Sequence, residues 1–214
     1  MVFRLTHELV FPDPRLADAD GLLAVGGDLS VDRLLLAYSH GIFPWTSFRH
    51  FDELHWYCPH ERFVIFPPEI HVSHSMRTLI RKQPYRLSIN EDFHGVIGQC
   101  GRLRLHEEGA WLGPQMTEAY ERLHHQGFAA SVEVWAGSRL VGGLYGVTIG
   151  RCFFGESMFS LVPSASKLAL IHLARVMEAR GGVLIDCQLE TPHLRSMGGR
   201  YIPYDDYLRL IRTE

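Results

Sequence analysis

Residues 129–160 contain three apolar runs interrupted by single polar residues, a pattern typical of half-buried strands. The runs are ASVEVW, RLVGGLYGVTIG and RCFFGESMFS. The links between them, AGS and the turn at Gly150, are so short that successive strands must be antiparallel neighbours. The pattern therefore predicts three antiparallel strands side by side.

A helix and a fourth strand follow. The segment SASKLALIHLARVMEARGG is amphipathic, with Leu170, Leu173 and Met177 in one stripe, and Ser164 is placed to cap its start. The apolar run VLIDCQ then predicts a buried strand. Three antiparallel strands, a helix and a strand predict a mixed α/β (α+β) sheet. This order is that of the core of acyltransferases of the N-acetyltransferase type.

The chain as a whole divides into two parts. Residues 1–62 are rich in Gly, Pro and aromatics and contain one clear helix, about Val31 to His40, with Asp28 and Ser30 as candidate caps. The prolines of PHERFVIFPPE indicate a boundary region. We therefore expect a small N-terminal domain over 1–62 and the acyltransferase-like domain over 63–214.

Further elements are predicted in the second part. A basic helix covers about Ser73 to Gln83, and the strand YRLSI follows it. Another helix starts near Asp92, and one runs from about Pro114 to His125 before Gly127 stops it.

Composition excludes several classes of protein. With 46% hydrophobic and 21% charged residues, the chain is typical of a soluble globular protein, and it has no apolar stretch of membrane-spanning length and no signal-peptide pattern. The four cysteines are scattered and the 13 histidines form no HExxH motif. We expect no disulfide, no metal and no membrane, and a cytoplasmic location.

Charge is unevenly distributed, although the net charge is only −3. No acidic residue lies between Glu69 and Glu91, where Arg77, Arg81, Lys82 and Arg86 all fall. This basic helix face is either a solvated surface or a contact surface for the phosphates of a nucleic acid.

Three polar residues stand in otherwise apolar strands. Asp186 and Gln188 are two residues apart, which places both on one face of a strand, where burial without partners would be costly. Glu156 interrupts GESMFS beside the glycine-rich LVGGLYGVTIG. Glycines there indicate a pocket floor or close packing of an aromatic ring, and Glu156 is either a carboxylate that holds a cation or a surface residue of an edge strand.

The loop before the amphipathic helix, SLVPSAS, has no glycine. A coenzyme A pyrophosphate site needs a glycine-rich loop at a helix N-terminus. We therefore expect a different acyl carrier.

Several motifs in order resemble one family. They are GLLAVGGDLSVDRLLLAYSHGIFPW, WYCPHER, LHHQGFAASVEVW, LVGGLYGV, FFGESMFS and LIDCQ, then His193 and SMGG. From about residue 21 to 200 the chain is similar to leucyl/phenylalanyl-tRNA–protein transferases. The resemblance implies transfer of Leu or Phe, with Met as a further candidate, from aminoacyl-tRNA to proteins that begin with Arg or Lys, which tags them for degradation. It also implies no cofactor and no metal.

The resemblance assigns roles to individual residues. Asp186 and Gln188 match the proposed catalytic pair, and Glu156 matches the residue near the acceptor's basic N-terminus. Trp45, Trp111 and Tyr120 match aromatics that hold the 3′-terminal adenosine, whereas Trp56 and Trp135 are expected in the core. The aminoacyl pocket is expected to include Leu144, Phe153, Leu170, Leu173 and Met177. The basic helix face, and not the resemblance, predicts that Arg77, Arg81 and Lys82 contact the tRNA backbone.

Some positions depart from the family pattern. Tyr57 replaces a Trp and Thr191 an Asn, while Leu144, Leu173 and Met177 stand where Met, Phe and Phe are common. The preference among Leu, Phe and Met therefore stays open.

The implied reaction is aminolysis of an ester, which needs orientation of the amine more than a strong base. We expect Asp186 to accept a hydrogen bond from the Gln188 side-chain amide and so aim its oxygen at the amine; a proton relay through Gln188 is the second choice. Two other functions stay open: a coenzyme A-dependent N-acetyltransferase, and a non-catalytic module that binds RNA or protein N-termini.

Overall fold

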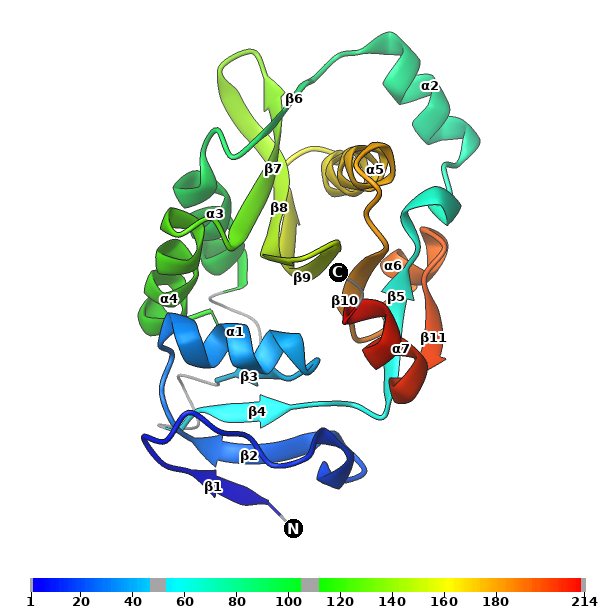
Figure 1. The fold of residues 1–214 in the computed structure, drawn as a ribbon. Coiled ribbons are helices and arrows are strands. Elements are labelled where there is room, and N and C mark those ends of the chain that lie inside the picture. The colour runs from blue at the N-terminus through cyan, green and yellow to red at the C-terminus, as the bar shows by residue number, and fades with distance from the viewer. Residues whose placement is uncertain (1, 47–52, 105–111, 213–214) are drawn as a thin grey trace.

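The computed structural model describes residues 2–46, 53–104 and 112–212. A mixed seven-stranded sheet forms its centre (Figure 1). In spatial order its strands are β11 (Arg200–Pro203), β5 (Glu61–Ile65), β10 (Leu184–Gln188), β9 (Cys152–Ser160), β8 (Arg139–Ile149), β7 (Ala129–Ala136) and β6 (Arg86–Ile89). The predicted unit is confirmed, since β7, β8 and β9 are antiparallel and β10 pairs parallel with β9.

Helices cover both faces of this sheet. The amphipathic helix α5 (Ala165–Ala179) packs on β7 and β8, and α2 (His74–Lys82) lies beside it. On the opposite face lie α3 (Phe93–Arg104) and α4 (Pro114–His125) (Figure 1). The sheet therefore separates two apolar cores, one around α5 and one around α3 and α4.

A second, four-stranded sheet is built from the first sixty residues. Its order is β1 (Phe3–Leu5), β2 (Leu22–Gly26), β4 (His55–Tyr57) and β3 (Phe43–Trp45). Helix α1 (Val31–Ser39) lies between this sheet and α4, and the core on its side is continuous with the core around α3 and α4. The two sheets thus share one apolar core.

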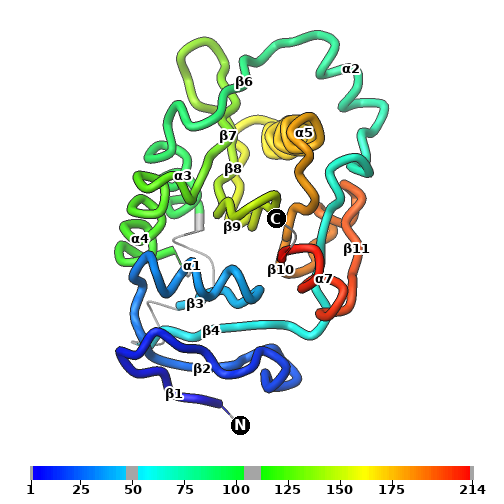
Figure 2. Tube along the Cα trace, in the orientation of Figure 1, coloured from blue at the N-terminus to red at the C-terminus, as the bar shows by residue number. Residues whose placement is uncertain are grey.

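Short elements complete the fold. They are the 3-10 turns η1 (Pro14–Leu16) and η2 (Pro67–Glu69) and the helices α6 (Pro192–Ser196) and α7 (Tyr204–Ile211). Figure 2 shows how β5, from the first third of the chain, runs between the C-terminal strands β10 and β11. The boundary expected at 62/63 therefore falls inside β5, a strand of the large sheet.

The predicted helix starts are confirmed within one or two residues, and of the two candidate caps of α1, Asp28 and Ser30, the structure has Ser30 as the N-cap. Ser164 is the N-cap residue of α5, as predicted, but it has a left-handed backbone with φ of 68°, and its side chain makes no capping hydrogen bond. Trp56 is fully buried, as predicted. The core prediction for Trp135 is wrong, since it is partly exposed and donates a hydrogen bond to Ser88 Oγ at 2.8 Å.

Candidate active site

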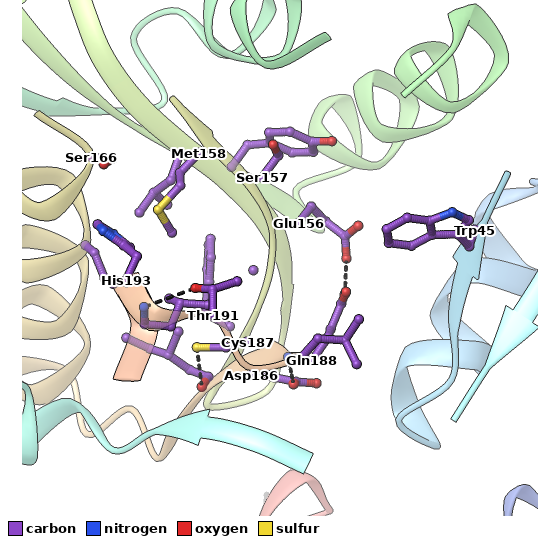
Figure 3. A pocket seen from close by; sticks show the side chains of 18 residues that line it. Trp45, Glu156, Ser157, Met158, Ser166, Asp186, Cys187, Gln188, Thr191 and His193 are labelled. Carbon is purple, nitrogen blue, oxygen red and sulfur yellow. Dashed lines mark hydrogen bonds between the residues drawn. The ribbon is translucent and has the colours of Figure 1, made fainter. Parts of the chain in front are cut away.

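A pocket of about 400 Å³ opens where β9 and β10 diverge (Figure 3). The two strands pair only as far as Phe154 and Asp186. Beyond Asp186 the register of β10 shifts, and Gln188 takes a left-handed backbone with φ of 62°. Such a conformation is uncommon outside glycine and marks a position that the surrounding structure constrains.

The pocket has an apolar wall and a polar wall. The apolar side chains are Leu144, Phe153, Met158, Leu170, Ile185, Leu189 and Leu194. The polar ones include Glu156, Ser157, Ser166, Cys187, Gln188, Thr191 and His193. Trp45 of β3 faces Glu156 and Gln188 from the N-terminal sheet, so both sheets contribute to the pocket (Figure 3).

Glu156 is placed by a β-bulge. Tyr145 of β8 pairs with Ser157 and Gly146 pairs with Gly155, so Glu156 has no partner across the ladder. Bulges of this kind re-aim side chains next to active sites. Since β9 lies between β8 and β10, the alternative of a surface residue on an edge strand is wrong.

Three donors meet the Glu156 carboxylate. The Tyr38 hydroxyl of α1 lies 2.6 Å from Oε1, the Tyr120 hydroxyl of α4 lies 2.7 Å from Oε2, and Gln188 Nε2 donates to Oε1 at 2.8 Å. Burial raises the pKa of Glu156 to about 7, although any hydrogen bond donated to its ionised form lowers that pKa. Burial and the neighbouring carboxylate also raise the pKa of Tyr38 and of Tyr120, which keeps both hydroxyls protonated.

Asp186 has different partners from those expected. Its fully buried carboxylate accepts three hydrogen bonds from the Arg62 guanidinium at 2.8–3.0 Å, and one from the Tyr207 hydroxyl at 2.6 Å. Burial opposes the charge of Arg62, but the Asp186 carboxylate raises its pKa above the ordinary value. Asp186 therefore anchors β10 to β5 and α7.

The expected hydrogen bond from the Gln188 side chain to Asp186 is wrong. Asp186 accepts the backbone N–H of Gln188 at 2.8 Å, while the Gln188 side chain turns to Glu156. The bulge after Asp186 breaks the two-residue alternation, so the two side chains do not stand on one strand face. No residue that the structure describes donates a hydrogen bond to Gln188 Oε1, which leaves this oxygen as an acceptor at the pocket.

The residues assigned to the adenosine lie in different surroundings. Trp45 is partly exposed on the pocket wall. Tyr120 is fully buried, with its ring against Tyr145 and its hydroxyl on Glu156. Trp111 lies outside the described residues. Of the two described positions, Trp45 lines the pocket and Tyr120 does not, and adenosine binding stays a prediction.

Three of the five residues assigned to the aminoacyl pocket line it: Leu144, Phe153 and Leu170. Leu173 and Met177, further along α5, belong to the apolar core and do not line the pocket. The glycines of β8 are close-packed rather than a pocket floor. A Cβ on Gly142 would lie 2.3 Å from the Ala165 side chain, and one on Gly146 would lie 2.2 Å from the Phe154 carbonyl oxygen.

The basic residues of α2 lie away from this pocket. Arg77, Arg81 and Lys82 are all exposed, and none lines it. The Arg77 guanidinium donates to the Val72 carbonyl at 2.8 Å. Neither Arg81 nor Lys82 forms an ion pair with any residue in the described ranges, so their charges face solvent. Contact with tRNA stays a prediction for all three.

Sequence reasoning missed Tyr38, Arg62 and Tyr207. A signal existed for Arg62, a charge next to the apolar run FVIF. Nothing local indicated that Tyr38 would reach Glu156, 118 residues later. Among the residues described, no group of His, Cys, Asp and Glu is arranged to hold a metal ion, and no helix is long and apolar enough to cross a membrane.

The mixed sheet, whose strands β9 and β10 diverge over a pocket with a half-buried carboxylate and an amide, has the strand and helix order predicted for an acyltransferase-like domain. The family models for the leucyl/phenylalanyl-tRNA protein transferase and for its N-terminal domain match residues 64–212 and 27–60. This chain belongs to the leucyl/phenylalanyl-tRNA protein transferase family, and it is an aminoacyltransferase.

Relatives of the same name support this membership. The protein from Syntrophobacter fumaroxidans is 49% identical over 98% of this chain and 89% of its own. That from Syntrophus aciditrophicus is 50% identical over 95% and 85%. Among solved structures, L-PGS from Bacillus licheniformis superposes with a TM-score of 0.45 at 10% identity, over 79% of this chain and 54% of that one.

Proposed function

We propose that this enzyme transfers leucine or phenylalanine from aminoacyl-tRNA to the α-amino group of proteins that begin with Arg or Lys. The observation that carries the acceptor assignment is Glu156, a carboxylate at the pocket with no Lys, Arg or His paired to it among the described residues. A cationic N-terminal side chain would supply the missing counter-charge. The new N-terminal Leu or Phe would then mark the acceptor for degradation in the cytoplasm.

The apolar wall of the pocket suits the side chain that is transferred. Leu144, Phe153 and Met158 present hydrocarbon and aromatic surface, which favours Leu, Phe or Met over polar side chains. We place the adenosine of the tRNA 3′ end against Trp45, because an unpaired base is held by stacking worth about 1–3 kcal/mol.

The reaction itself is attack of the acceptor amine on the aminoacyl ester, with departure of the ribose oxygen. An α-amino group has a pKa of about 7.7–8, so a useful fraction is neutral at neutral pH. Gln188 is the residue that we assign to the amine. Its Nε2 is held by Glu156, and its Oε1 is directed to accept an N–H of the amine as positive charge develops.

Asp186 acts indirectly in this scheme. It holds the backbone N–H of Gln188 and the Arg62 guanidinium, and so keeps the end of β10 in its constrained conformation. A proton relay from Gln188 to Asp186 is disfavoured, since the Gln188 side chain does not contact that carboxylate and an amide is a poor base.

The test is incubation with labelled Leu-tRNA and a protein that begins with Arg, beside matched proteins that begin with Lys or Gln. Label should enter the Arg and Lys proteins and not the Gln protein. Equal labelling of all three would contradict the acceptor assignment. Acetyl transfer from acetyl-coenzyme A would favour the N-acetyltransferase alternative, and binding without any product would favour the non-catalytic module.

A further inference from the structure

Three oxygen-bearing groups form a closed ring behind the pocket. The hydroxyls of Tyr38 and Tyr120 lie 2.8 Å apart, and each also lies within 2.6–2.7 Å of one oxygen of Glu156. Each group therefore contacts the other two. Both tyrosines are fully buried, from α1 and α4, so each hydroxyl must find its partner within the ring.

The number of protons decides the charge of this ring. Three contacts at these distances require three hydrogens if each is a hydrogen bond, and two tyrosine hydroxyls supply only two. With Glu156 ionised, both hydroxyls would donate to the carboxylate, and the 2.8 Å contact between Tyr38 and Tyr120 would bring lone pairs together. A proton on Glu156 completes the ring.

The proton has one favourable position. If Glu156 Oε2–H donates to the Tyr120 oxygen, Tyr120 donates to Tyr38, and Tyr38 donates to Glu156 Oε1. Oε1 then keeps its carbonyl character and accepts the Gln188 Nε2–H as well. All four donors are satisfied in this arrangement, and the ring carries no charge.

The surroundings favour the neutral acid. Among the described residues, the groups that act on Glu156 are Tyr38, Tyr120, and Asp186 and Gln188 on β10, with Tyr145 of β8 beside the two tyrosines, and none of these is a cation. The charge of Arg62 is taken up by Asp186. Burial raises the pKa of Glu156 to about 7.

We propose that Tyr38 and Tyr120 are positioning residues that hold Glu156 as a carboxylic acid in the free enzyme, and that entry of a cationic acceptor N-terminus displaces this proton. On binding, the Glu156 O–H bond breaks, the proton passes to the solvent, and the carboxylate pairs with the incoming cation. The inference rests on the proposed function, since it needs the acceptor's cation beside Glu156. It makes acceptor selection dependent on pH.

The test counts the protons released on binding at about pH 6, by calorimetry in two buffers of different ionisation enthalpy. The ligands are a short peptide that begins with Arg and the same peptide that begins with citrulline, the neutral isostere. Both carry the same α-amine, so the difference between them isolates the side-chain charge. We expect the Arg peptide to release up to about one proton more in the wild type, by linkage, and none more in Glu156→Gln.

Two hydroxyl deletions test the ring. In Tyr38→Phe or Tyr120→Phe, opening the ring leaves the neutral acid without its closed set of partners, and we expect the extra release to fall below about half. Tyr204→Phe is the matched control, because this buried hydroxyl donates to the His40 carbonyl at 2.8 Å and does not contact Glu156. On binding the Arg peptide, the Tyr204→Phe variant should release as many extra protons as the wild type does.

The outcomes separate the two proposals. If the enzyme prefers the Arg peptide over the citrulline peptide without extra proton release, the proposal that the ring holds a protonated Glu156 is wrong, while the acceptor assignment stands. Unchanged release in both Phe variants would show that the tyrosines do not hold the proton, and would also overturn it. Absence of any preference for Arg would overturn the acceptor assignment and the coupling together.

Discussion

At the scale of single residues, the polar groups beside the pocket divide into two sets. In the first set, Asp186 accepts hydrogen bonds from Arg62 and Tyr207; all three are fully buried and hold β10, β5 and α7 together. Glu156 and Gln188 bond each other at the pocket, where a substrate can reach them. The first set should govern stability and the second activity.

Asp186→Asn tests the first set. It leaves the Arg62 charge buried without its counter-charge, and a broken buried pair costs about 3–5 kcal/mol. We expect a loss of that size in urea unfolding. Asp205→Asn is the control, since it breaks an exposed pair with Arg15 that water screens, and it should leave urea unfolding almost unchanged. An Asp186→Asn protein of normal stability but without activity would give Asp186 a direct role in the chemistry.

Gln188→Ala tests the second set. One neutral hydrogen bond is lost, so the free energy of unfolding should fall by only about 1 kcal/mol. The single-turnover rate with saturating acceptor should fall about 100-fold, because the amine loses its orienting acceptor. A near-normal rate in a folded variant that binds aminoacyl-tRNA would remove Gln188 from the reaction and favour aminolysis assisted by the substrate alone.

At the scale of elements, close packing of β8 against β9 aims Glu156. The bulge there depends on Gly146, where a Cβ would meet the Phe154 carbonyl oxygen and the Phe153 ring at 2.2–2.6 Å. Backbone cannot move aside as a flexible side chain can. The glycine pattern that sequence reasoning linked to a pocket is thus needed for strand packing next to the pocket.

Gly146→Ala should therefore destabilise the protein by about 1–3 kcal/mol and weaken use of acceptors that begin with Arg. Gly98→Ala on α3 is the control. Its Cβ meets nothing within 4 Å, and alanine favours a helix by up to about 1 kcal/mol. Thermal unfolding of both variants and the acceptor KM are the measurements. A Gly146→Ala protein with wild-type stability would contradict the packing argument.

The basic face of α2 is the second element with a testable role. Replacing Arg81 and Lys82 by Ala removes two exposed charges that pair with no described residue. If both contact phosphates, the log–log salt slope of tRNA binding should fall by about 0.7–0.9 for each.

The control for that slope is Arg209→Ala with Arg212→Ala, the same charge change at the exposed end of α7. It should leave the slope as it is. An unchanged slope in the α2 variant would mean that its basic face is solvated surface only.

At the scale of the whole molecule, the pocket needs both sheets. Trp45 comes from the small sheet, and the Tyr38 ring packs 5.4 Å from Phe154 of the large one. The Arg62 guanidinium lies 4.9 Å from both the Phe43 and the Tyr207 rings, which ties β3, β5 and α7. The shared core should make the two parts one cooperative unit.

We therefore expect a single unfolding transition. Two variants, one retaining only Trp56 of the small sheet and one only Trp135 of the large sheet, should show the same urea midpoint by fluorescence. Far-UV circular dichroism of each variant checks that the Trp replacements leave both folds intact. Two separate midpoints would mean that the small sheet unfolds independently.

The sequence by itself determined the local elements and the family. Caps, short links and amphipathic stripes predicted α1, α2, α4 and α5 and the antiparallel strands β7 to β9, because these signals act between residues close in the chain. Ordered motifs such as GESMFS and LIDCQ pointed to the transferase family that the relatives confirm.

Only the tertiary structure decided which side chains pair with Asp186, Gln188 and Glu156. Alternation in VLIDCQ placed Asp186 and Gln188 on one face, but a bulge and a left-handed backbone at Gln188 separated them. Arg62, 124 residues away, took up the Asp186 charge, and Tyr38 and Tyr120 came together across 82 residues to meet Glu156. A buried charge or hydroxyl must find its partner wherever packing brings one, and periodicity along a chain carries no information about contacts at that separation.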